Sequence, residues 1–71
     1  MEQAVEALGQ RVRSARDAKG WTQEDLAHES GLAVVQVSRI ERGAREIRLT
    51  TLLRLLSALD IAADELLDGL Y

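Results

Sequence analysis

Residues 22–43 read Thr-Gln-Glu-Asp-Leu-Ala-His-Glu-Ser-Gly-Leu-Ala-Val-Val-Gln-Val-Ser-Arg-Ile-Glu-Arg-Gly and decide the fold of this chain. Thr22 precedes a run of helix-forming residues, and Asp25 follows three positions later, which is the pattern of a capped helix start. Gly31 lies where the chain must turn sharply. Glycine suits this position because it adopts a left-handed conformation without steric cost. The stretch therefore predicts two short helices joined by a tight turn, with the second helix starting at about Ala33.

The second of these helices has two different faces. Ala33, Val37 and Ile40 recur at helical spacing, so we expect them to face inward, with Gln36 at the edge of that stripe. The opposite face combines apolar and basic side chains, namely Val34, Val35, Ser38, Arg39 and Arg42. Arginine bonds guanine bidentately and an apolar side chain rests on a thymine methyl group, so this face suits DNA. The alternative is that the two valines belong to the core of a small domain.

Two helices joined in this way form a helix-turn-helix, a unit that places its second helix in the DNA major groove. The net charge of −3 opposes phosphate binding, but the distribution of charge favours it. Four arginines lie within residues 39–48 against two glutamates, whereas residues 60–71 hold four carboxylates and no basic residue. Positive charge is therefore concentrated beside the expected groove-reading helix.

Length and composition exclude several classes of protein. The 71 residues predict one domain, residues 1–71, and so small a core rarely supplies more than about 3–5 kcal/mol without support such as dimerisation. The absence of cysteine excludes disulfides, and one histidine cannot form a metal cluster, so we expect no metal and no cofactor. No apolar run approaches the roughly 18 residues of a membrane span. A soluble, cytoplasmic protein is expected.

Three further helices complete an all-α prediction without any strand signal. Their apolar residues recur at helical spacing in a first helix of about residues 3–19, a fourth helix and a short fifth helix within residues 61–71. The expected inward stripes are Val5, Leu8, Val12 and Ala15 on the first helix and Leu49, Leu52, Leu53, Leu56 and Leu59 on the fourth. The fifth region carries more apolar surface than one small core readily uses, so we expect a dimer interface formed by Leu67, Leu70 and Tyr71. The alternative is that these residues complete the core.

Three motifs and a leucine-rich segment carry a resemblance to a known family. They are Trp21-Thr22-Gln23-Glu24-Asp25-Leu26-Ala27, Ser30-Gly31-Leu32, Val37-Ser38-Arg39-Ile40-Glu41-Arg42-Gly43 and residues 49–59. Together they resemble the lambda-repressor-like, Xre-type helix-turn-helix family of transcriptional regulators over nearly the whole chain. The resemblance implies a compact five-helix fold, with the helix-turn-helix in its second and third helices, and a homodimer that binds an inverted repeat in double-stranded DNA. It also implies a buried ion pair between Arg16 and Glu41.

The same resemblance assigns roles to individual residues. The residues implied to read bases are Val34, Val35 and Arg39, with Gln36 and Ser38 beside them. The residues implied to contact the DNA backbone are Thr22, Gln23, Arg42, Arg45 and Arg48. The two valines replace polar residues common in the family, so we expect hydrogen-bonded readout to rest largely on Arg39, with thymine methyl contacts and DNA shape supplying the remainder. Ala33 replaces a common Ser or Thr cap, which we expect to weaken capping of this helix by about 1 kcal/mol.

These features predict a sequence-specific, DNA-binding transcriptional regulator of a bacterium or phage. A single bare domain with Ile47 before a capping site is similar to the controller proteins of restriction-modification systems, although Glu46 and Arg48 depart from their usual Asn and Ser or Thr. The alternative is an antitoxin or another protein-interaction module. We expect no enzyme and no catalytic residue, because the carboxylates, serines and histidine form no acid–base pair or nucleophile motif. Nothing in the sequence indicates a small-molecule effector.

Overall fold

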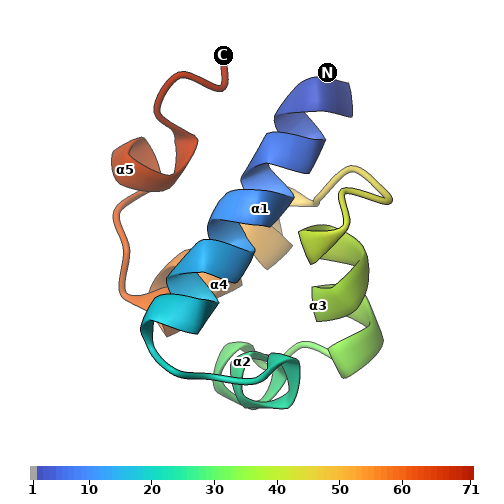
Figure 1. Cartoon of the computed structure of the whole chain (residues 1–71), viewed down its shortest axis with the longest axis vertical. Helices are drawn as coiled ribbons and strands as arrows, with labels where there is room; N and C mark the ends of the chain where they lie inside the picture. The colour runs from blue at the N-terminus through green and yellow to red at the C-terminus, as the bar shows by residue number, and fades with distance from the viewer. Residues whose placement is uncertain (1) are drawn as a thin grey trace.

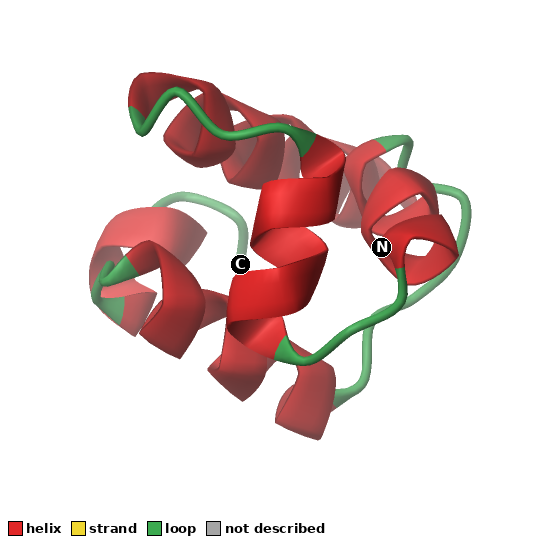
Figure 2. Ribbon diagram, turned by 90° about the horizontal axis from the view of Figure 1, so that it is seen from below, coloured by secondary structure: helices red, strands yellow, loops and turns green. Residues whose placement is uncertain are grey.

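The computed structural model describes residues 2–71 and contains five helices. They are α1 (Glu2–Ala18), α2 (Gln23–Ser30), α3 (Val34–Glu41), α4 (Leu49–Leu59) and α5 (Ala63–Leu67). No strand occurs among these residues (Figure 2), so the all-α, five-helix prediction is confirmed. In Figure 1, α1 crosses the molecule with α3 on one side and α5 on the other. No helix within residues 2–71 is long and apolar enough to span a bilayer.

The core lies where α1 meets the other helices. Val12 of α1, Leu26 of α2 and Leu55 of α4 have no exposed surface, and full burial of such a side chain contributes about 1.5–3 kcal/mol. Among the described residues 2–71, the buried apolar side chains are Leu8, Val12, Leu26, Ala27, Val37, Leu55, Leu59 and Leu66. The expected stripe of α1 is confirmed at Leu8 and Val12, while its outer members Val5 and Ala15 are half-buried.

The stripe expected on α4 is wrong in two places. Leu49 is 70% exposed and Leu53 is 54% exposed, whereas Leu55, which lies outside the expected stripe, is fully buried. The leucines of α4 all lie within about half of its circumference, a stripe that is wider than its buried part, so helical spacing alone does not select which of them are buried. The packing of α4 against α1 and α2 selects the stripe that contains Leu55 and Leu59. Two large apolar side chains of α4 therefore remain on the surface.

The start of α3 also differs from the expectation. Ala33 is the N-cap, with extended backbone, and α3 begins at Val34. Ala33 is exposed, so the expectation that it faces inward is wrong. The reason is that a cap residue lies half outside the helix and does not share its helical periodicity. Val37 is fully buried and Ile40 packs half-buried against the core, so the inward face of α3 is otherwise as predicted.

The backbones of α1 and α3 approach each other closely at the end of α3. A Cβ atom on Gly9 would overlap the carbonyl oxygen of Ile40 and would lie 2.9 Å from that of Glu41. Gly43, just after α3, has a φ of 66°, and a Cβ atom there would lie 2.7 Å from the Cα of Glu6. Glycine permits both contacts because it has no Cβ atom. The end of α3 is therefore held directly against α1, which orients the outer face of α3.

Candidate DNA interface

The first helix of the helix-turn-helix begins with the predicted cap. The backbone N–H of Asp25 donates to the Thr22 hydroxyl at 3.1 Å, and the backbone N–H of Thr22 donates to the Asp25 carboxylate at 2.9 Å. This reciprocal pair fixes where α2 begins. At the other end, Gly31 adopts the left-handed conformation, with a φ of 73°, and its N–H donates to the carbonyl of Ala27. The predicted cap and the predicted glycine turn are both confirmed.

The ion pair implied by the family resemblance is present and joins α1 to α3. Arg16 donates from Nε to Glu41 Oε2 at 2.7 Å and from Nη2 to Glu41 Oε1 at 3.0 Å. The two side chains are only 10% and 3% exposed. The hydrogen bonds to Glu41 raise the pKa of Arg16, which keeps the guanidinium charged. Arg16 Nη1 also donates to the carbonyl of Trp21 at 2.7 Å, so the pair holds α1, the start of the motif and α3 together.

Gln23 lies at the first position of α2 but is already engaged within the protein. Its Nε2 donates to Glu41 Oε1 at 3.2 Å, and the side chain is half-buried. A DNA phosphate is an acceptor and needs a donor, so a phosphate would have to compete with Glu41 for this amide. The structure therefore shows Gln23 as part of the hydrogen-bond network that orients α3. Its contact with the DNA backbone stays a prediction.

The outer face of α3 carries the valines as surface residues. Val34 is 41% exposed and Val35 is 52% exposed, whereas Val37 in the same helix has no exposed surface. The alternative that Val34 and Val35 are core residues is therefore wrong. Arg39 is exposed one turn beyond Val35, and the half-buried Ser38 lies one turn beyond Val34. These residues form one continuous surface, which we call the α3 outer face: Val34, Val35, Gln36, Ser38 and Arg39.

Gln36 has a capping function that the sequence interpretation did not include. Its Oε1 accepts a hydrogen bond from the backbone N–H of Ala33 at 2.9 Å. A capping box has two hydrogen bonds, and the other one needs an acceptor on the side chain of the cap residue. Alanine has no such acceptor, so only the bond to Gln36 forms. It satisfies the Ala33 N–H but supplies no acceptor for the N–H groups of the first turn, so the predicted weakness is only partly offset. The Gln36 amide nitrogen is left as the group of this side chain that can donate to a base.

Three of the four arginines predicted to bind DNA lie around one hollow between α3 and the start of α4. Arg39, Arg45 and Arg48 line it together with Gln36 and one carboxylate, that of Glu46, and its volume is about 320 Å³. Arg42 lies outside this hollow, where its Nε donates to the carbonyl of Ser38 at 3.3 Å. Within residues 2–71, the ion pairs involve none of these four arginines. The structure therefore brings base-reading and phosphate-binding candidates together with their positive charge uncompensated by ion pairs.

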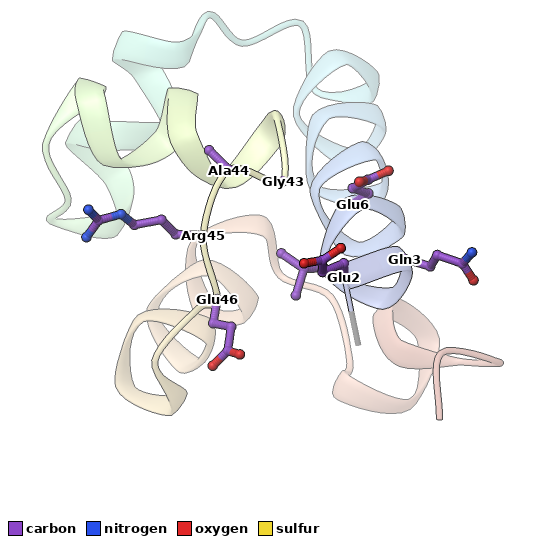
Figure 3. A pocket seen from close by; sticks show the side chains of 8 residues that line it. Glu2, Gln3, Glu6, Gly43, Ala44, Arg45 and Glu46 are labelled. Carbon is purple, nitrogen blue, oxygen red and sulfur yellow. The ribbon is translucent and has the colours of Figure 1, made fainter.

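A larger groove lies between α1 and the loop after α3, and it has a different character (Figure 3). Its charged lining residues are Glu2, Glu6, Glu46 and Arg45. In Figure 3 the side chain of Arg45 points away from α1, so the carboxylates dominate this groove. An acidic groove repels phosphate, which leaves the hollow with three arginines as the better place for a DNA strand.

The residues predicted to form a dimer interface lie at the end of the chain but differ in exposure. Leu67 and Leu70 pack half-buried against the core, which is the alternative that the sequence left open, whereas Tyr71 is 99% exposed. Arg11 of α1 holds this end in place by donating to the carbonyl of Leu66 at 3.0 Å and to that of Asp68 at 2.6 Å. Their role in a dimer stays a prediction. More apolar surface is free on α4, at the two exposed leucines.

One further link was missed by the sequence interpretation. Arg54 of α4 donates from Nη1 to the carbonyl of Gly31 at 3.3 Å and so ties α4 to the turn between α2 and α3. No motif signals this contact, because the acceptor is a backbone atom 23 positions away in the sequence. Within the described chain, residues 2–71, no group of three or more His, Cys, Asp or Glu side chains is placed to hold a metal ion.

These features define a helix-turn-helix domain of the lambda-repressor-like fold. Its two helices are joined at a left-handed glycine, the second helix has an exposed outer face, and a buried ion pair lies behind that helix. Comparison with known proteins agrees with this class. The family model described as helix-turn-helix matches residues 12–66 of the chain. The chain therefore belongs to this helix-turn-helix family.

Relatives and solved structures place the chain among regulators. A hypothetical transcription factor of Neisseria meningitidis is 40% identical over 60 residues, which cover 84% of this chain and 57% of that protein. The crystal structure of the restriction-modification controller protein C.AhdI from Aeromonas hydrophila has a TM-score of 0.84 at 45% identity, covering 93% of this chain and 98% of that chain. The controller protein C.Esp1396I, solved as a tetramer with its natural 35 base-pair operator, has a TM-score of 0.84 at 28% identity, covering 94% and 88%.

Proposed function

We propose that this chain is a sequence-specific, DNA-binding transcriptional regulator that inserts α3 into the major groove of an inverted-repeat operator as a homodimer. The observation that carries the proposal is the α3 outer face, which exposes Val34, Val35 and Arg39 beside arginines that are free of ion pairs. Arginine donates to guanine, and valine contacts a thymine methyl group. We propose that the protein acts in the cytoplasm, by binding rather than by catalysis.

The likeness to C.AhdI over almost the whole length of both chains supports a narrower proposal, that the chain controls a restriction-modification operon. A dimer places its two α3 helices about 34 Å apart, one helical turn of DNA. Direct contact through Arg39 then supplies specificity, while Arg45 and Arg48 neutralise phosphates. These two contributions are separable, because only phosphate contacts act equally on every sequence.

Fluorescence anisotropy titrations with labelled duplexes test this division of roles. The Arg39→Ala variant should lose about 1–3 kcal/mol of binding free energy on its preferred sequence and relax the preference at one base pair. The matched Arg45→Ala variant should weaken binding to all sequences alike and reduce the salt dependence of the affinity. Equal losses on every sequence for both variants would remove the base-reading role of Arg39.

We further propose that the homodimer forms through the exposed leucines of α4, Leu49 and Leu53, with Tyr71 adding to the interface. The support is their exposure of 70%, 54% and 99%, since a domain of this size gains stability by covering such surface. Sedimentation velocity tests this: Leu53→Glu should produce a monomer where the native chain is a dimer. Gln10→Glu is the matched control, because it adds the same charge at an exposed position of α1. A native chain that stays monomeric at high micromolar concentration would contradict dimerisation itself.

A further inference from the structure

Val34 and Val35 form an apolar patch that dimerisation through α4 does not explain. They are the first two residues of α3 and belong to the α3 outer face, whereas the apolar patch of α4 is separate. Recognition helices use their N-terminal residues to contact base edges. The patch therefore lies where a base edge would be met in the proposed complex, and its chemistry restricts what it can bind.

The α3 outer face offers mostly donors and methyl groups. Arg39 has donors only, and the Oε1 of Gln36 already accepts the N–H of Ala33 at 2.9 Å, which leaves its amide nitrogen as a donor. The acceptors that remain are the second lone pair of Gln36 Oε1 and the hydroxyl of Ser38, which is half-buried. Valine side chains make no hydrogen bonds. What they can distinguish at a major-groove edge is the presence or absence of an apolar group.

The apolar group that a pyrimidine presents in the major groove is its C5-methyl group. Thymine carries it, uracil and cytosine lack it, and 5-methylcytosine carries it at the same ring position. We propose that Val34 and Val35 bind the C5-methyl group of a pyrimidine in the operator, so that affinity depends on the methylation state of that base as well as on its identity. This inference rests on the proposed placement of α3 in the major groove.

A consequence is that cytosine methylation within a binding site changes affinity directly. Adding one methyl group against an exposed valine buries about one CH₂ equivalent of apolar surface, which corresponds to about a fourfold change in affinity. The change acts without any altered hydrogen bond, because methylation at C5 leaves the pairing edge and the amino group of cytosine intact. Modified operator DNA would therefore be bound more tightly than unmodified DNA at such a position.

The experiment uses a fluorescein-labelled duplex carrying an operator selected by the native protein. Each thymine of one half-site is replaced in turn by uracil, which removes only the methyl group. At the most sensitive position, cytosine and 5-methylcytosine, each paired with guanine, are then compared. We expect the thymine duplex to be bound about fourfold more tightly than the uracil duplex, and the 5-methylcytosine duplex about fourfold more tightly than the cytosine duplex. The double variant Val34→Ala, Val35→Ala should bring both ratios close to one.

Arg45→Ala is the control variant, since loss of a phosphate contact lowers affinity on all four duplexes and leaves both ratios unchanged. The inference is overturned if the native protein prefers its operator but no uracil or 5-methylcytosine substitution alters affinity, or if the double alanine variant retains both ratios. If the native protein shows no preference for any sequence, the proposed function itself fails. The variants stay folded because both valines are exposed, and unchanged circular dichroism verifies this.

Discussion

Removal of one member of the Arg16–Glu41 pair should destabilise the fold severely, whereas removal of both should not. Glu41 accepts three hydrogen bonds, from Nε and Nη2 of Arg16 and from Nε2 of Gln23. Breaking a buried pair by removing one partner costs about 3–5 kcal/mol, because a charge is left without its partner. A small core supplies a similar amount in total, so each single variant should be close to unfolding at 25 °C.

The structure also predicts which single variant is worse. In Glu41→Leu, Arg16 keeps the carbonyl of Trp21 at 2.7 Å and the exposed carboxylate of Asp17 at 3.2 Å. In Arg16→Met, Glu41 is 3% exposed and keeps only the amide of Gln23. Arg16→Met should therefore lie at the upper end of the range and Glu41→Leu at the lower end. The double variant replaces the pair by apolar groups and should recover most of the loss.

Urea denaturation at pH 7 measures these differences, followed by far-UV circular dichroism and by the fluorescence of Trp21, the single tryptophan. Because the pKa of Arg16 is raised in the folded state, its contribution is complete at neutral pH and is lost only when the pH rises through that pKa. A cost of less than about 1 kcal/mol for Glu41→Leu, or a double variant less stable than both single variants, would show that the buried pair does not hold the fold in this way.

Substitutions at two other positions test the backbone geometry by urea denaturation. Gly9→Ala should destabilise by about 1–3 kcal/mol because its Cβ atom would overlap the carbonyl of Ile40; the gain of about 1 kcal/mol expected for alanine in an open helix would contradict the close approach. Asp60 follows the last residue of α4 and has a left-handed backbone, with a φ of 53°. Asp60→Gly should therefore stabilise the fold by about 0.5–1 kcal/mol, whereas Asp60→Ala should not. Equal effects of the two variants would show that the left-handed backbone is not strained.

Features that depend on near neighbours were predictable from the sequence. Thr22 and Asp25 are three residues apart, and Gly31 needs only its own backbone freedom, so the cap and the turn follow from local chemistry. The division of helix faces is harder, because the leucines of α4 form a stripe wider than its buried part, and spacing alone does not select the buried ones. Leu55 is buried and Leu53 is exposed because of how α4 packs on α1 and α2.

At the candidate DNA interface, too, spacing in the sequence does not decide which residues are exposed. Exposure of Val34 and Val35 was expected but not decided by the sequence, since valines at the start of a short helix fit a core equally well. The capping bond from Ala33 to Gln36 spans only three residues, so the spacing of a capping box could have indicated it, whereas the close approach at Gly9 depends on three-dimensional placement. A glycine inside a long helix signals that something lies close, but it does not identify the partner.

Selection of bound sites from a random DNA library tests whether the α3 outer face reads a specific sequence as part of a symmetric dimer. We expect enrichment of an inverted repeat whose half-site centres lie about 34 Å apart, and loss of that enrichment with Arg39→Ala. The enriched operator should be bound at least about a thousandfold more tightly than random DNA. Recovery of no motif at moderate salt, or of the same motif with Arg39→Ala, would contradict sequence reading by this face.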